Sequence, residues 1–120
     1  MEINIDGIDA EKAMDLYDDD MDIFISVLHS YISNIPTSIN KLRHVSAETL
    51  KDYAVTIHGI KGTSATIGAE KTREAAKKLE ALAAAGDLSG VLAFHEAFLK
   101  QVDDLVHSIQ NWLTQYEAES

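Results

Sequence analysis

The sequence contains no cysteine, which excludes disulfide bonds, thiol catalysis and cysteine-ligated metal sites within its 120 residues. It has one proline and six glycines, too few turn-forming residues for a fold with many strands. No apolar run approaches the roughly 18 residues of a membrane-spanning helix, and the N-terminus (MEINIDG) is acidic rather than signal-like. We therefore expect a soluble, cytoplasmic protein that forms a single domain over residues 1–120.

Positive charge is scarce as well. Ten basic residues face 20 acidic ones, and the net charge of −10 counts against nucleic acids and anionic membranes as partners. Residues 1–22 hold nine acidic side chains and one lysine, whereas residues 40–78 hold eight basic and four acidic side chains. This asymmetry predicts that the middle of the chain meets an anion, although chance clustering on solvated helix faces would give the same pattern.

Apolar residues recur at helical spacing along the whole chain, and no segment shows the alternation of a strand. The pattern predicts five helices, which cover Asp9 to Tyr17, about 20–43, about 47–67, about 69–85 and the stretch from Leu88 to Tyr116. Pro36 is expected to kink the second helix, and Gly68 and Gly86 to end the third and fourth. We therefore expect an all-α fold, an antiparallel four-helix bundle with a short extra N-terminal helix.

Helix bundles often hold metal ions, but this sequence lacks the usual ligand patterns. Di-iron bundles use Glu-x-x-His motifs, and none of the five histidines has a glutamate three residues before it. His95 and Glu96 begin like a zinc-protease motif, but position 99 is leucine instead of histidine. We expect no metal and no cofactor to be bound by this chain.

The five histidines separate by their helical angles. His95 falls within an apolar stripe and is expected to be buried with a hydrogen-bond partner, while His29, His44 and His107 fall on polar faces. His58 points about 120° away from the centre of its helix's buried stripe. Its side chain should therefore be accessible in the middle of a rigid helix.

The residues around His58 are unusual for an exposed helix face. Gly59 and Gly62 each cost about 0.8–1 kcal/mol relative to alanine inside a helix. Close packing against a neighbouring helix would explain them, but Gly62 points about 160° from the core, which favours clearance for another protein. Lys61 should neighbour His58 at i+3 spacing, where its charge would stabilise a phosphoryl group on the ring by on the order of 1 kcal/mol.

Residues 58–69 read HGIKGTSATIGA, which closely resembles the HxxKGxS…G signature of histidine-containing phosphotransfer (HPt) domains. The acidic lead-in, the proline-interrupted second helix and the Ala/Leu/Lys-rich fourth helix are similar to that family, so the resemblance covers nearly the whole chain. Ile60 stands where leucine is usual and Thr63 where serine is common, and both are mild departures.

The resemblance implies that His58 accepts a phosphoryl group, that Lys61 supports that group and that Gly62 leaves clearance. Ser64 matches a family position but points toward the core, which assigns it to packing or a helix hydrogen bond. The resemblance also implies a protein that is not an enzyme and has no ATP site of its own. Partners would dock on the surface beside His58, which we expect to comprise Lys51, Val55, Gly59 and Ala65.

The implied partners are receiver domains of response regulators and a histidine kinase or hybrid kinase. A receiver would supply the reacting aspartate and the Mg²⁺ ion. Two alternatives stay open: a silent helical adaptor, and the phospho-accepting module of a larger histidine kinase. The intact His58 and Lys61 argue against the silent adaptor. The phosphoryl donor distinguishes the kinase module from a relay carrier, because the module takes phosphate from ATP through a kinase domain and the carrier takes it from a phosphorylated receiver.

Overall fold

The computed structural model describes residues 3–119, and these residues form helices without any strand. The elements are α1 (Ala10–Leu16), α2 (Met21–Lys41), the 3₁₀ turn η1 (Ala47–Thr49), α3 (Leu50–Thr66), α4 (Glu70–Ala84) and α5 (Leu88–Glu119). Their order and approximate bounds match the helices that the sequence predicts. The expected all-α class is confirmed.

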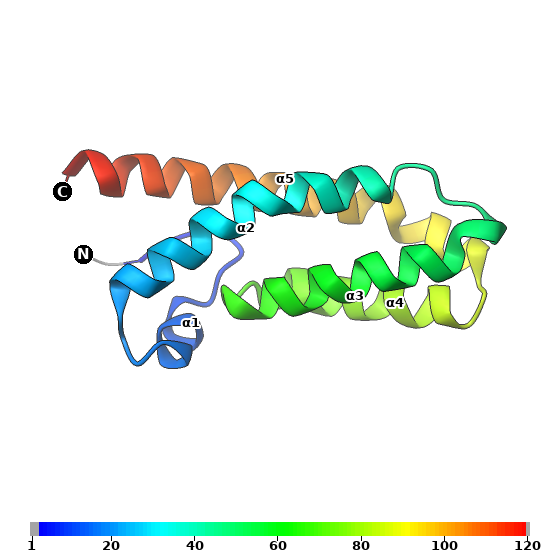
Figure 1. Ribbon diagram of the computed structural model, residues 1–120, viewed down its shortest axis with the longest axis horizontal. Coiled ribbons are helices and arrows are strands. Elements are labelled where there is room, and N and C mark those ends of the chain that lie inside the picture. The colour runs from blue at the N-terminus through cyan, green and yellow to red at the C-terminus, as the bar shows by residue number, and fades with distance from the viewer. Residues whose placement is uncertain (1–2, 120) are drawn as a thin grey trace.

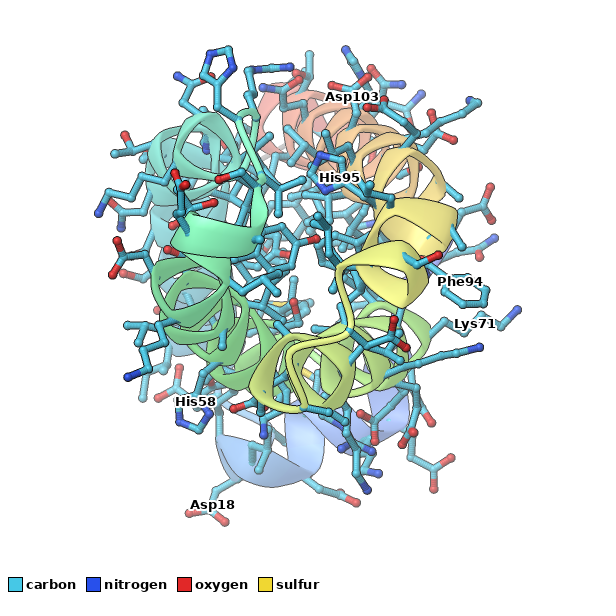
Figure 2. The ribbon with its side chains drawn as sticks, turned by 90° about the vertical axis from the view of Figure 1, so that its right-hand side faces the viewer. Asp18, His58, Lys71, Phe94, His95 and Asp103 are labelled. Atoms are coloured by element: carbon cyan, nitrogen blue, oxygen red, sulfur yellow. The ribbon has the colours of Figure 1, made fainter. Side chains whose placement is uncertain are left out.

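Helices α2 to α5 form the predicted antiparallel bundle, joined by short connections (Figure 1). Seen end-on, the four helices surround one core in the order α2, α3, α4, α5 (Figure 2). The short α1 closes the end of the bundle where α3 passes into α4. There the Asp9 amide donates to the Gly68 carbonyl (2.8 Å), and the Tyr17 hydroxyl donates to the Thr66 carbonyl (2.6 Å).

Local capping explains where the helices begin and end. The Asp9 carboxylate accepts a hydrogen bond from the Lys12 amide (3.1 Å), and the Asp20 carboxylate accepts one from the Ile23 amide (3.2 Å). Gly68 has a φ of +73°, a left-handed conformation that side chains with a Cβ resist. A Cβ at Gly68 would also lie 2.6 Å from the Asp9 carbonyl oxygen, so this glycine permits both the turn and the docking of α1.

The start of the third helix differs from the prediction. Residues 47–49 form a tight 3₁₀ turn instead of α-helix, because the Thr49 amide bonds to the Ser46 carbonyl three residues back (3.1 Å). The Ser46 amide in turn donates to the Thr49 hydroxyl (2.8 Å). The α-helical geometry that presents His58 therefore begins only at Leu50.

The core holds aliphatic and aromatic side chains from all four long helices, together with two polar pairs. Fully buried members include Phe24, Leu28, Ile57, Ile60, Leu79, Val91 and Ile109. Ser64 is buried as expected, and its hydroxyl pairs with the Tyr31 hydroxyl at 3.1 Å. His95 is also buried as expected, with its Nδ1 3.0 Å from the Tyr53 hydroxyl.

The buried His95 should make the protein less stable in mild acid. Burial lowers the pKa of its imidazole below the ordinary 6.5, so the unfolded chain takes up the proton first as the pH falls. Stability is therefore lost below about pH 6.5, by up to about 1.4 kcal/mol between pH 7.5 and 5.5. Urea unfolding of wild type and His95→Gln at both pH values checks this. Equal pH dependence in the two proteins would contradict it.

No helix among residues 3–119 combines the length and the apolar character that crossing a membrane requires.

Candidate functional site

Helix α3 exposes the predicted row of residues along one side. Positions 51, 55, 58, 62 and 65 fall within one narrow sector of the helix at 100° per residue. Lys51, Val55, His58 and Gly62 are exposed and Ala65 is half-buried. Val55 is 73 % exposed, more than any other large hydrophobic residue that the structure leaves at its surface. The expected docking residues Lys51, Val55 and Ala65 therefore share a surface with His58, and Gly59 is exposed at the edge of that surface.

His58 lies on the outside of the bundle, whereas His95 points into it (Figure 2). The His58 side chain is 66 % exposed, and its Nδ1 lies 2.7 Å from Oε2 of Glu80 on α4. The other carboxylate oxygen of Glu80 accepts a hydrogen bond from the Lys61 ammonium at 2.6 Å. One carboxylate thus joins the two residues that the sequence singles out.

The Glu80 carboxylate determines which nitrogen of His58 carries a proton. The Lys61 ammonium holds the pKa of the Glu80 carboxyl below its usual range; partial burial opposes this effect and the His58 hydrogen bond adds to it. An ionised carboxylate can only accept hydrogen bonds, so Nδ1 of His58 must be the donor. In the neutral ring, Nε2 then keeps its lone pair, and no residue within 3–119 forms a hydrogen bond with it. The geometry leaves Nε2 with a free lone pair on a side chain that is 66 % exposed.

Glu80 is the part of the site that sequence reasoning missed. It borders the buried stripe of α4, which comprises Thr72, Ala76, Leu79 and Ala83. A half-buried acid at such a boundary is a signal that a partner lies on the next helix. The identity of that partner depends on the alignment of α3 with α4.

The two glycines beside His58 do not serve packing within this chain. Apart from the adjoining backbone of α3 and the two chain neighbours, a Cβ built on Gly59 or on Gly62 would meet no atom of residues 3–119 within 4 Å. The alternative of close packing against a neighbouring helix is therefore excluded for both. Together they cost the helix about 2 kcal/mol relative to alanine, and no packing contact that a larger side chain would disturb offsets this cost in the part of the chain that the structure describes.

Gly59 also lines a groove of about 200 Å³ between α2 and α3, on the side of α3 away from Glu80. The groove carries no charged side chain, and its lining comprises Val27, Ser30, Tyr31, Asn34, Ile35, Ser38, Gly59, Thr63 and Thr66. The surface at Gly59 therefore extends from α3 toward α2 without a charged side chain.

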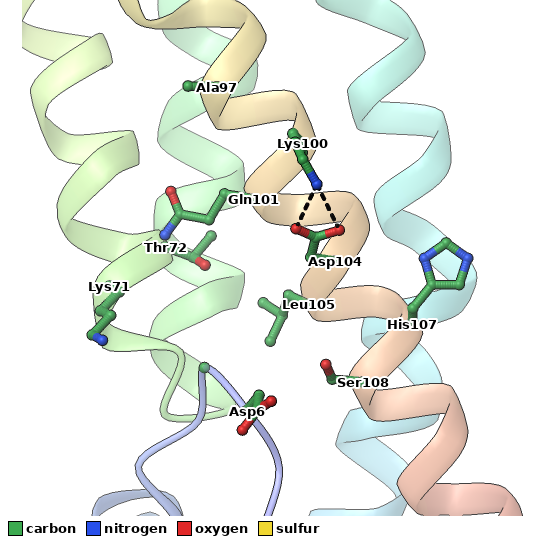
Figure 3. Close-up of a pocket in the computed structure, with 11 residues that line it drawn as sticks. Asp6, Lys71, Thr72, Ala97, Lys100, Gln101, Asp104, Leu105, His107 and Ser108 are labelled. Atoms are coloured by element: carbon green, nitrogen blue, oxygen red, sulfur yellow. Dashed lines mark hydrogen bonds and ion pairs between the residues drawn. The ribbon is translucent and has the colours of Figure 1, made fainter.

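A larger pocket of about 680 Å³ lies between the N-terminal segment, α4 and α5, and includes none of the residues of the motif (Figure 3). Its cations and anions partly neutralise one another, since Lys100 forms an ion pair with Asp104 at 3.1 Å. Within residues 3–119, no cluster of three or more His, Asp or Glu side chains could hold a metal ion.

Comparison with known proteins adds one decisive match. The family model of the Hpt domain matches residues 21–119, which covers α2 to α5 with the motif and its surroundings. The chain belongs to the Hpt domain family. No curated protein and no solved structure gives a significant match.

Membership in this family makes the protein a phosphotransfer carrier of phosphorelays. Hpt domains carry phosphoryl groups without a catalytic ATP site of their own, and receiver domains and kinases are the partners that the family implies. The matched region begins at α2 and leaves out α1, which the structure nevertheless joins to the end of α3.

Proposed function

We propose that His58 is the phospho-accepting residue of this Hpt domain and exchanges its phosphoryl group with receiver aspartates. The observation that carries this proposal is the contact between Nδ1 of His58 and Glu80, which leaves an exposed Nε2 with a lone pair. Two of the other histidines fit the role less well, because His95 is buried and because the Glu117 carboxylate engages Nε2 of His29 (2.8 Å), the nitrogen that Glu80 leaves open in His58.

In the proposed step, Nε2 attacks the phosphorus of a receiver's phospho-aspartate. An N–P bond forms, and the bond from phosphorus to the aspartyl oxygen breaks, so that the carboxylate leaves with the electron pair. The His58 ring keeps its proton on Nδ1 and becomes positively charged, and the Glu80 carboxylate balances that charge. The reverse attack by another receiver's aspartate returns the free imidazole, and the receiver supplies the Mg²⁺ ion.

Lys61 and Gly62 have separate roles in this proposal. The Lys61 ammonium, bound to Glu80 before transfer, lies one turn from His58 and can support the phosphoryl oxygens. Gly62 keeps the approach to Nε2 free of side-chain atoms. The partner docks on Lys51, Val55, Gly59 and Ala65, and the uncharged groove beside Gly59 extends this surface.

The direct test is labelling of the purified protein by a panel of phosphorylated receiver domains with Mg²⁺. We expect acid-labile, alkali-stable phosphate to appear on the protein, as a phosphohistidine requires. Labelling by a histidine kinase domain with ATP, but by no receiver, would instead indicate the module of a larger kinase. Failure of both donors would indicate a silent adaptor.

Glu80 should act as a positioning residue for His58. Removal of the carboxylate in Glu80→Ala leaves Nδ1 without its acceptor, so both ring tautomers become populated and transfer should slow about tenfold. Glu80→Gln keeps an acceptor oxygen and should slow transfer less. ¹⁵N NMR of the His58 ring provides the independent readout, because the Nδ1–H form should dominate in wild type and decline in Glu80→Ala. An unchanged tautomer would contradict this role.

A further inference from the structure

The side of α4 that faces α3 carries a cation to which the motif assigns no role. Arg73, Lys77, Glu80 and Ala84 recur there at three- and four-residue spacing, so they share one side of the helix. Glu80 contacts His58 and Lys61 across the helix pair, which fixes where the motif lies along α4. Lys77 is exposed and lies one turn before Glu80.

The alignment of the two helices places Lys77 beside the clearance at Gly62. Helices α3 and α4 lie side by side and run antiparallel (Figure 1), so a step back along α4 is a step forward along α3. With Glu80 opposite His58 and Lys61, Lys77 lies opposite the next turn of α3, which holds Gly62. Gly62 has no side chain that could cover Lys77, and a Cβ built at Gly62 would meet open space. This turn of α3 therefore does not screen Lys77 from an approaching protein.

The neighbouring charges are already paired, but that of Lys77 is not. Glu74, one turn before Lys77, bonds to Arg73 at 2.6 Å, and Glu80, one turn after it, binds Lys61 at 2.6 Å. Within residues 3–119, no ion pair or hydrogen bond holds the Lys77 ammonium. The charge of Lys61 is offset by Glu80 before transfer, so Lys77 supplies uncompensated positive charge one turn along α4 from the residue that contacts His58.

Lys78 provides a natural comparison. It is the same residue type on the same helix and is also exposed, but it lies on a different side of α4. Its ammonium lies 3.7 Å from the centre of the Phe94 ring, which is on α5. Lys78 is therefore directed away from the surface that carries His58.

We propose that Lys77 is a docking residue that pairs with a carboxylate at the rim of the receiver's phosphorylation site. This inference rests on the proposed function, since the acidic partner is the receiver that exchanges phosphate with His58. A receiver must gather carboxylates around its aspartate to bind Mg²⁺, so its rim is negatively charged. An exposed, unpaired cation beside the point of contact accelerates the encounter with such a surface, and salt weakens this effect.

The test compares Lys77→Gln with the matched variant Lys78→Gln, using the receiver of the panel that labels wild type fastest. Transfer rates are measured at subsaturating and saturating receiver, in about 0.05 M and about 0.5 M salt. At low salt and subsaturating receiver we expect Lys77→Gln to be slower by about three- to tenfold, while Lys78→Gln matches wild type. High salt should shrink the difference, saturating receiver should remove it, and Lys77→Arg should restore the wild-type rate.

Two results would overturn the inference, and they differ from a failure of the proposed function. Equal rates for both glutamine variants at low salt would show that Lys77 takes no part in docking. A loss that persists at saturating receiver and at high salt would show a structural effect instead of an encounter effect. A wild type that no receiver labels would overturn the proposed function itself, and the role of Lys77 with it.

Discussion

His58→Gln is expected to lose all phosphohistidine and to keep its fold. Glutamine has no lone-pair nitrogen that can attack phosphorus, so the loss should be complete instead of partial. The side chain is 66 % exposed, and within the described part of the chain its ring has a single hydrogen bond, to Glu80, which the glutamine amide can replace. Stability should therefore change by less than about 0.5 kcal/mol. Labelling by a phosphorylated receiver and urea unfolding measure the two effects.

The matched control for this variant is His95→Gln. His95 is buried and bound to Tyr53, so its replacement affects stability and its pH dependence but not the surface of α3. Label that persists in His95→Gln and disappears in His58→Gln would assign the phosphoryl group to a single ring. Label that survives in His58→Gln would refute the assignment.

Gly62→Gln should stabilise the protein and yet block transfer. The Cβ of the new side chain would meet no neighbouring element among residues 3–119 within 4 Å, and glutamine is a better helix former than glycine. The free energy of unfolding should rise by about 0.5–1 kcal/mol. The same side chain occupies the open space one turn from His58, where a receiver must approach, so transfer should slow by about tenfold or more.

A graded series separates clearance from other effects at this position. Gly62→Ala adds a single carbon and should gain stability with a smaller loss of transfer than Gly62→Gln. Ala93→Gln adds the same amide at an exposed position on α5, away from α3, and should leave the transfer rate unchanged. Normal transfer by Gly62→Gln would show that the glycine does not provide clearance.

These opposite effects on stability and transfer would explain why the helix keeps its glycines. Gly59 and Gly62 reduce stability without a packing benefit among residues 3–119, so their value lies in what approaches from outside. Val55 adds to this argument, because a valine that is 73 % exposed gains burial only when a partner covers it.

Much of the fold could be predicted because its determinants are local. An aspartate accepts hydrogen bonds from amides two or three residues ahead, as Asp9 and Asp20 do, and a glycine reaches a left-handed φ by itself, as Gly68 and Gly86 do. Helical periodicity likewise determined which residues face the core. For this reason the exposure of His58 and the burial of His95 were both predicted correctly.

The sequence by itself therefore determined the helices, their order and the side of α3 on which His58 lies, since all of these depend on contacts within a few residues. Only the tertiary structure decided which residue of α4 lies opposite His58, because helix register depends on how buried side chains pack. That register brings Glu80 to His58 and Lys61, and the position inferred for Lys77, one turn before Glu80, follows from it. The chemistry of the imidazole was visible in the motif, whereas its proton and its charged surroundings come from a second helix.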